Sequence, residues 1–143
     1  MSRAVIINNQ SLLLAYDPRI EPKHDYEPKA SFYYLPGGHI EFQETAEGSL
    51  MRKLFEETGY EIYIENFLGV VEYSWGFPGD EICCHTHEIN LIFQAQFMED
   101  IGNIEIPQKE ENIALKWVPL NELGSIDLRP EDLKELIPEW LEI

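Results

Sequence analysis

Residues 45–58 constrain the fold more than any other segment of this chain. Their apolar side chains recur at intervals of three and four residues, which predicts an amphipathic helix, and Gly59 follows where a left-handed C-terminal cap is expected. Since the flanking segments are extended by pattern, we expect this helix to cover a β-sheet. The side chains predicted to face the core are Leu50, Met51, Leu54 and Phe55.

Extended segments outnumber helical ones in the rest of the chain. Residues 3–16 are expected to form two short strands joined by a polar turn, and Pro130 is expected near the first turn of a closing helix over 131–141. These elements predict one domain over residues 1–143, an α/β sandwich with a mixed sheet flanked by helices. The further extended segments are 31–35, 39–42, 61–75, 87–98 and 114–120, and the expected loops are 17–29, 76–80 and 101–112.

The chain is strongly acidic, with 27 Asp and Glu against 10 Lys and Arg and a formal net charge of -17. This charge would repel duplex nucleic acid and anionic membranes, so neither is an expected partner, and an anionic phosphate substrate would need a bridging cation. The sequence has no apolar run long enough to cross a bilayer and no leader with a cleavage site, and its only cysteines, Cys83 and Cys84, are adjacent. We therefore expect a soluble, cytoplasmic protein.

Carboxylates gather on and before the predicted helix. A helical projection places Ser49, Lys53, Glu56 and Glu57 on one narrow face, apart from the apolar face, and Glu44 precedes the helix. Several hard oxygen ligands close together suit Mg²⁺ or Mn²⁺ and the phosphate oxygens that such ions recruit. By itself this pattern is more typical of a solvated helix face.

The string from Gly38 to Tyr60, GHIEFQETAEGSLMRKLFEETGY, resembles the Nudix box, G-x5-E-x7-R-E-U-x-E-E-x-G-U, in which U is a bulky apolar residue. The spacing agrees throughout, and Leu35-Pro36-Gly37 resembles the usual lead-in. The resemblance implies a Nudix-type α/β/α sandwich whose first helix carries the box, and a hydrolase of phosphoric anhydrides that uses Mg²⁺, with Mn²⁺ as an alternative. It also implies a small nucleotide substrate and is compatible with a homodimer. The positions that match are Gly38, Glu44, Arg52, Leu54, Glu56, Glu57 and Gly59.

The resemblance also implies roles for individual residues. Glu56 and Glu57 would bind the metal ions, and the carbonyl of Gly38, where the backbone approaches closely, would be a further ligand. Arg52 would orient Glu44 through a charge-assisted contact, or would form an ordinary i,i+4 pair with Glu56. In several family members a carboxylate from a late loop is the base.

Glu110 and Glu111 match that late carboxylate by position, and Glu111 is also a candidate metal ligand. The alternative for either one is a solvated loop residue. Their position, immediately before the strand predicted at 114–120, makes them the candidates for general base.

Lys53 departs from the box, which has Glu at this position. An ammonium here would remove an anionic ligand, add positive charge and pair with the remaining carboxylates, which weakens a metal site. Two readings follow. The chain is a metal-dependent pyrophosphohydrolase of nucleoside diphosphate derivatives or triphosphates with water as the nucleophile, or it is a catalytically weakened Nudix-fold module that binds or senses a nucleotide. Lys53 would in either case be able to contact substrate phosphates.

Other side chains are candidates for substrate recognition. Glu88 begins an otherwise apolar strand and needs a partner or an edge position. Arg19, Lys23 and His24 in the early loop are candidates to contact a phosphate or a sugar. A zinc site at Cys83-Cys84-His85-Thr86-His87 is rejected, because the spacing matches no usual zinc pattern. The aromatic side chains that could stack on a base, or equally pack in the core, are Phe32, Tyr34, Tyr73, Trp75 and Phe77.

Overall fold

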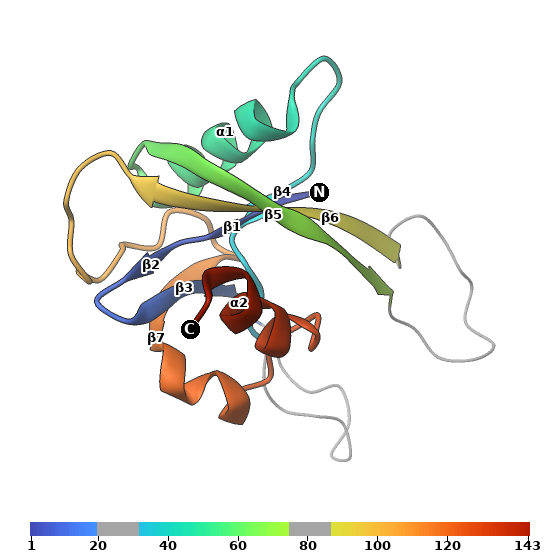
Figure 1. The fold of residues 1–143 in the computed structure, drawn as a ribbon. Helices are drawn as coiled ribbons and strands as arrows, with labels where there is room; N and C mark the ends of the chain where they lie inside the picture. The colour runs from blue at the N-terminus through green and yellow to red at the C-terminus, as the bar shows by residue number, and fades with distance from the viewer. Residues whose placement is uncertain (20–31, 75–86) are drawn as a thin grey trace.

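Two β-sheets lie between two α-helices in the computed structural model, which describes residues 1–19, 32–74 and 87–143 (Figure 1). The first sheet has the strand order β4-β1-β6-β5, and the second has the order β2-β3-β7. Helix α1 packs with the core on one side of this assembly, and α2 packs on the other. The architecture is the predicted α/β class with a mixed sheet and two flanking helices.

The first sheet contains β1 (Ser2–Val5), β4 (Gly37–Gly38), β5 (Ile62–Ser74) and β6 (His87–Phe97). It is mixed, because β1 runs parallel to β6 while β4 and β5 are antiparallel to their neighbours. The parallel pair joins the start of the chain to a strand about 90 residues later, with Ser2 opposite Leu91. On its other side β1 pairs with β4, with Ser2 opposite Gly38, and this places the first residues of the chain beside the box.

The second sheet is antiparallel and contains β2 (Ile7–Asn8), β3 (Ser11–Tyr16) and β7 (Ala114–Pro119). The predicted hairpin is confirmed: Asn9 and Gln10 form its turn, with φ of 49° and 61°. Positive φ at both central residues is the geometry of a type I′ turn, whose twist matches that of the flanking strands.

Helix α1 (Ala46–Thr58) confirms the predicted helix, and both caps explain its bounds. The Thr45 side chain accepts a hydrogen bond from the Gly48 amide, and Gly59 has a φ of 79° at the C-cap. The predicted core face is only half right: Leu50 and Leu54 are fully buried, but Met51 is 41% exposed and Phe55 is 52% exposed.

The helix is rotated relative to that prediction, so that its buried stripe also includes polar side chains. Ser49, Glu57 and Thr58 are buried together with Leu50 and Leu54. The acidic face is therefore not separate from the core face, as the helical projection suggested. A projection shows which residues share a side of the helix, whereas the neighbouring sheet and loops decide which side is covered.

Helix α2 (Leu133–Leu141) closes the chain, and Leu133 and Ile137 are its buried residues. It begins three residues after Pro130, and it contains Pro138. A 3₁₀ helix at Leu120–Ser125, which the sequence patterns did not predict, follows β7 directly. The strands predicted at 61–75, 87–98 and 114–120 are confirmed over their described residues to within two residues at each end.

Two predicted strands are wrong. Residues 32–35 make only isolated bridges, Ala15 with Tyr34 and Tyr33 with Leu128, and residues 39–42 lead into a turn instead of a strand. The backbone of residues 33 and 34 pairs through single bridges with two different segments of the chain. A local sequence pattern does not reveal such pairing. In the described ranges no helix has the length and apolar character to span a membrane. Most of the loop predicted at 17–29 and all of the turn at 76–80 lie outside the described residues.

Candidate active site

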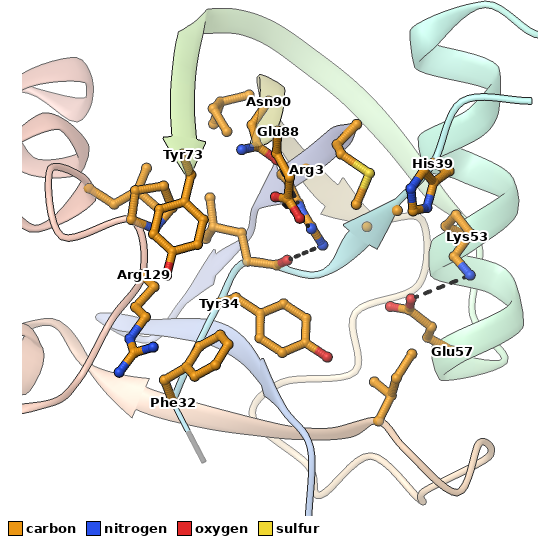
Figure 2. Close-up of a pocket in the computed structure, with 18 of the residues that line it drawn as sticks. Arg3, Phe32, Tyr34, His39, Lys53, Glu57, Tyr73, Glu88, Asn90 and Arg129 are labelled. Atoms are coloured by element: carbon orange, nitrogen blue, oxygen red, sulfur yellow. Dashed lines mark hydrogen bonds and ion pairs between the residues drawn. The ribbon is translucent and has the colours of Figure 1, made fainter. Parts of the chain in front are cut away.

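A pocket of about 600 Å³ opens beside α1 and the first sheet. One end is formed by the box residues Gly38, His39, Lys53 and Glu57, and the other end is aromatic (Figure 2). This volume falls in the range of small-molecule sites. The labelled residues that line the rest of the pocket are Arg3, Phe32, Tyr34, Tyr73, Glu88, Asn90 and Arg129.

Glu57 is a buried carboxylate at the box end of the pocket. The residue is 3% exposed, and its Oε2 has no hydrogen-bond partner, the one such buried side-chain atom found in residues 1–19, 32–74 and 87–143. Burial raises the pKa of Glu57 from 4.5 to about 7, while the charge of Lys53 opposes that rise and the charge of Glu110 adds to it. A buried carboxylate with an unpartnered oxygen and a raised pKa is typical of a functional site.

Arg52 connects the start of the box to α1. Its guanidinium donates two hydrogen bonds to Glu44, from Nε to Oε2 at 2.7 Å and from Nη2 to Oε1 at 2.9 Å. It also donates from Nη1 to Glu56 at 3.3 Å and from Nη2 to the carbonyl of His39 at 3.3 Å. Both contacts considered for Arg52, the one with Glu44 and the i,i+4 pair with Glu56, are therefore present.

Lys53 lies between the two carboxylates assigned to metal binding. Its Nζ is 3.5 Å from Glu56 Oε2 and 3.9 Å from Glu57 Oε1, and the second contact is drawn in Figure 2. The aliphatic stem of Lys53 lies against Gly38, where an added Cβ would be 2.7 Å from Lys53 Cε. The lysine thus packs on the glycine that was expected to approach a metal ion.

The far end of the pocket is built from aromatic and guanidinium groups. The Phe32 and Tyr34 rings lie 6.1 Å apart, and the Arg129 guanidinium lies 4.3 Å from the centre of the Phe32 ring. Asp127 holds Arg129 through contacts of 3.0 and 3.1 Å. Flat rings and a stacked guanidinium form a surface on which a planar base can stack.

The family model of the NUDIX domain matches residues 2–140. The chain belongs to the Nudix family. Its box therefore carries the family's residues at all the fixed positions except that of Lys53.

Individual relatives are distant. The chain is 26% identical to the NAD-capped RNA hydrolase NudC of Pseudomonas aeruginosa, covering 96% of this chain and 42% of that protein. It is 29% identical to the NudC of Mannheimia succiniciproducens, covering 82% of this chain and 38% of that protein. The chain therefore spans less than half the length of these curated relatives.

Solved structures share the fold. The MutT protein from Methanosarcina mazei Go1 has a TM-score of 0.69 at 18% identity, covering 99% of this chain and 91% of that one. A UDP-X diphosphatase has a TM-score of 0.67 at 19% identity, covering 99% of this chain and 60% of that one. These likenesses show a Nudix-type α/β/α sandwich.

The two late carboxylates differ in their surroundings. Glu110 is close enough for its charge to raise the pKa of Glu57, whereas the charge of Glu111 acts on Arg19. The Gln108 side chain donates hydrogen bonds to the backbone carbonyls of both residues, at 3.0 and 3.1 Å. Asn112 and Ile113, which follow them, line the pocket. Of the pair, Glu110 is the one whose charge acts on the buried carboxylate.

The fit of a divalent cation to this pocket depends on the ligand atoms that the box residues offer. Within the part of the chain that the structure describes, no three His, Cys, Asp or Glu side chains converge as a metal-binding group. Glu57 nevertheless presents a buried oxygen without a partner, and Glu56 is the next carboxylate along the same helix. These oxygens, with the Gly38 carbonyl, are hard ligands that suit one such ion.

Sequence reasoning missed several pocket residues, among them Arg3, Asn90 and Arg129. Arg3 donates to Asn90 Oδ1 at 3.2 Å and to the Leu35 carbonyl at 3.3 Å, and it pairs with Glu88 at 3.4 Å. Glu88, which was proposed because it needs a partner, does line the pocket. Asn90 inside an apolar strand was the available signal, since a buried amide must be satisfied by a specific neighbour.

The remaining candidates are not brought to the pocket. Arg19 pairs with Asp17 at 3.3 Å, and His87 contacts Glu72 at 3.2 Å. Both pairs are outside the pocket lining. The candidates that lie outside the described residues are Lys23, His24, Trp75, Phe77, Cys83, Cys84 and His85.

The Arg52 contact gives a titration that can be tested. Its hydrogen bonds lower the pKa of Glu44 from 4.5 to about 2, and the Glu41 amide adds to this shift. We expect ¹³C NMR to show Glu44 ionised down to about pH 2 in the wild type, and Arg52→Gln to return its pKa most of the way to 4.5. Because the folded pKa is lowered, the stability from this pair is present above pH 4.5 and is lost as the pH falls toward 2.

Arg129→Gln is the matched control, since it removes a guanidinium that holds Asp127 at the other end of the pocket. It should leave the Glu44 titration unchanged. An Arg52→Gln protein whose Glu44 still titrates near 2 would show that the Glu41 amide is the main cause.

Proposed function

We propose that this Nudix protein is a metal-dependent pyrophosphohydrolase that cleaves the diphosphate linkage of a nucleoside diphosphate derivative or triphosphate. The observation that carries the proposal is Glu57, a buried carboxylate with one unpartnered oxygen that lines a pocket with an aromatic opposite end. A diphosphate at the Glu57 end and a base at the aromatic end would span such a pocket. Membership in a family of hydrolases supports the same activity.

The chain's own residues have distinct roles in this proposal. Glu56, Glu57 and the Gly38 carbonyl would hold the cation, and Glu111 is the further ligand expected from the family pattern. When bound, Mg²⁺ or Mn²⁺ supplies charge neutralisation at the diphosphate, polarisation of phosphorus and a lower pKa for water. Arg52 positions Glu44 and Glu56 through its fork of hydrogen bonds.

The reaction is a substitution by water at phosphorus. The water oxygen forms a bond to one phosphorus, the bridging P–O bond breaks, and the leaving phosphate carries its electron pair. The proton of water passes to a base, for which Glu110 and Glu111 are the proposed candidates. The products are then X-phosphate and a nucleoside monophosphate, or pyrophosphate and a nucleoside monophosphate.

A small diphosphate-linked nucleotide is the proposed substrate class. The relatives named for NAD-capped RNA and the structure named for UDP-X both refer to groups joined to a nucleotide through a diphosphate. A chain with a formal charge of -17 is poorly suited to a long polyanion, because the charges repel. The part of a substrate that enters the pocket is therefore proposed to be the nucleotide itself.

One observation favours a second function. Lys53 neutralises part of the charge of Glu56 and Glu57 in the structure. If it prevents cation binding altogether, the pocket binds a nucleotide without hydrolysing it, and the chain is a binding or sensing module.

An assay distinguishes the two functions. Release of phosphate and pyrophosphate is measured from nucleoside triphosphates and diphosphate-linked nucleotides, with Mg²⁺, Mn²⁺ or EDTA, for wild type and Glu56→Gln. We expect turnover that EDTA abolishes and that Glu56→Gln lowers by at least about tenfold. Glu47→Gln, an exposed carboxylate on the same helix, is the control and should match the wild type.

Two outcomes would contradict the hydrolase proposal. Unchanged turnover in Glu56→Gln would place the chemistry elsewhere. No turnover across the panel, with a nucleotide still bound, would establish the binding module.

A further inference from the structure

Lys53 is held in the pocket by more than its charge. Its stem fills the space above Gly38, where any Cβ would be 2.7 Å from Lys53 Cε. Its side chain is 21% exposed, although lysines normally extend into water. The absence of a Cβ at Gly38 is therefore what lets the lysine stem lie in its present position.

The Lys53 ammonium lies beside two carboxylates whose negative charge a cation would balance. It is 3.5 Å from Glu56 and 3.9 Å from Glu57, whose side chain is 1% exposed. Within the described residues no other lysine or arginine makes an ion pair with Glu57, and its second oxygen is unpartnered. The structure thus provides one fixed positive charge beside a buried negative one, with one oxygen left for a further ligand.

We propose that the Lys53 ammonium takes the place of one divalent cation, as a tethered counter-ion between Glu56 and Glu57 whose stem lies against Gly38. This inference rests on the proposed function, because it concerns the same metal site. The site therefore binds fewer divalent ions than it would with the family's Glu at position 53. The oxygen of Glu57 that has no hydrogen-bond partner is left for the ion that does bind.

Binding of Mn²⁺ alone tests this proposal without any turnover. The number and affinity of bound ions are measured by electron paramagnetic resonance for wild type, Lys53→Glu and Lys53→Met. We expect Lys53→Glu to bind one more Mn²⁺ per chain than the wild type. Lys53→Met keeps an apolar stem on Gly38 without the charge, and we expect it to bind its first Mn²⁺ at least about tenfold more tightly.

Lys116 provides the matched control, since it is exposed on β7 and outside the pocket lining. Lys116→Glu and Lys116→Met change the net charge equally, so they correct for general attraction of cations to a more acidic protein. They should bind Mn²⁺ as the wild type does.

The outcomes separate the inference from the proposed function. Equal Mn²⁺ number and affinity in wild type and both Lys53 variants would overturn the inference while the hydrolase proposal stands. Absence of Mn²⁺ binding in the wild type and both variants, together with absence of turnover, would overturn both. Lys116 variants that gain as much as the Lys53 variants would reduce the effect to net charge and also overturn the inference.

Discussion

Glu57→Gln is expected to lower metal-dependent turnover by about 1,000-fold while it stabilises the metal-free protein above neutral pH. The loss of turnover follows from the proposed role of Glu57 as the buried ligand of the cation. The gain in stability follows from burial, because the ionised carboxylate has one oxygen without a partner. The glutamine amide has the same shape but no charge, so it avoids the free-energy cost of burying an ionised group.

The pH dependence has a defined sign. Burial raises the pKa of Glu57 from 4.5 to about 7, so between these values the folded state holds a proton that the unfolded state has released. Wild-type stability should therefore fall as the pH rises from 4.5 to 7, by up to about 3 kcal/mol at about 1.4 kcal/mol per pKa unit. The charges that act on this group are those of Lys53, Glu110, Arg3 and Glu56.

Urea denaturation in EDTA from pH 4.5 to 8 measures this effect. Glu57→Gln should remove this part of the pH dependence and become more stable than the wild type above pH 7, while Glu47→Gln should follow the wild type. A difference between Glu57→Gln and wild type that is the same at every pH would show that the pKa of Glu57 is not raised in the folded state.

Gly37→Ala is expected to destabilise the protein by about 3 kcal/mol or more. Gly37 has a φ of 145°, which L side chains rarely adopt, and an added Cβ would overlap the carbonyl oxygen of Ser2 on β1. The strand cannot move away, because β1 is also paired with β6 and Ala4 and Val5 are fully buried. The loss would be a large fraction of the usual stability of a domain.

Urea unfolding midpoints of wild type, Gly37→Ala and Gly124→Ala test this prediction. Gly124, in the 3₁₀ helix, has open space around an added Cβ and no positive φ, so its alanine variant should stay within about 1 kcal/mol of the wild type. If both alanine variants unfold at the same urea concentration, close packing of β4 on β1 is not the constraint that the structure indicates.

Local sequence signals were sufficient to predict most of the helices and strands. The cap residues Thr45 and Gly59 determine where α1 begins and ends, and both are visible in the sequence. The turn at Asn9 and Gln10 and the strands β5, β6 and β7 follow from equally local patterns. The strand predicted at 31–35 was wrong, because its described residues pair only with Ala15 and Leu128, which are far away in the sequence.

The residues of the candidate site were also predictable only where local sequence identifies them. Resemblance to the Nudix box identified Arg52 with its partner Glu44 and the departure at Lys53. It did not identify Arg3, because the contacts of Arg3 with Glu88 and Asn90 exist only through the parallel pairing of β1 with β6. Nor did it separate Glu110 from Glu111, which are adjacent in the chain.

By itself the sequence determined the family, the fold class and the order of charges along the box, because these depend on residue types at fixed separations. Only the tertiary structure decided that Glu57 is buried with the core residues Leu50 and Leu54, and that Lys53 packs on Gly38. The physical reason is that burial and pKa depend on what covers a helix face. That cover includes β1, which lies against α1 and is itself paired with β6 about 90 residues later in the chain.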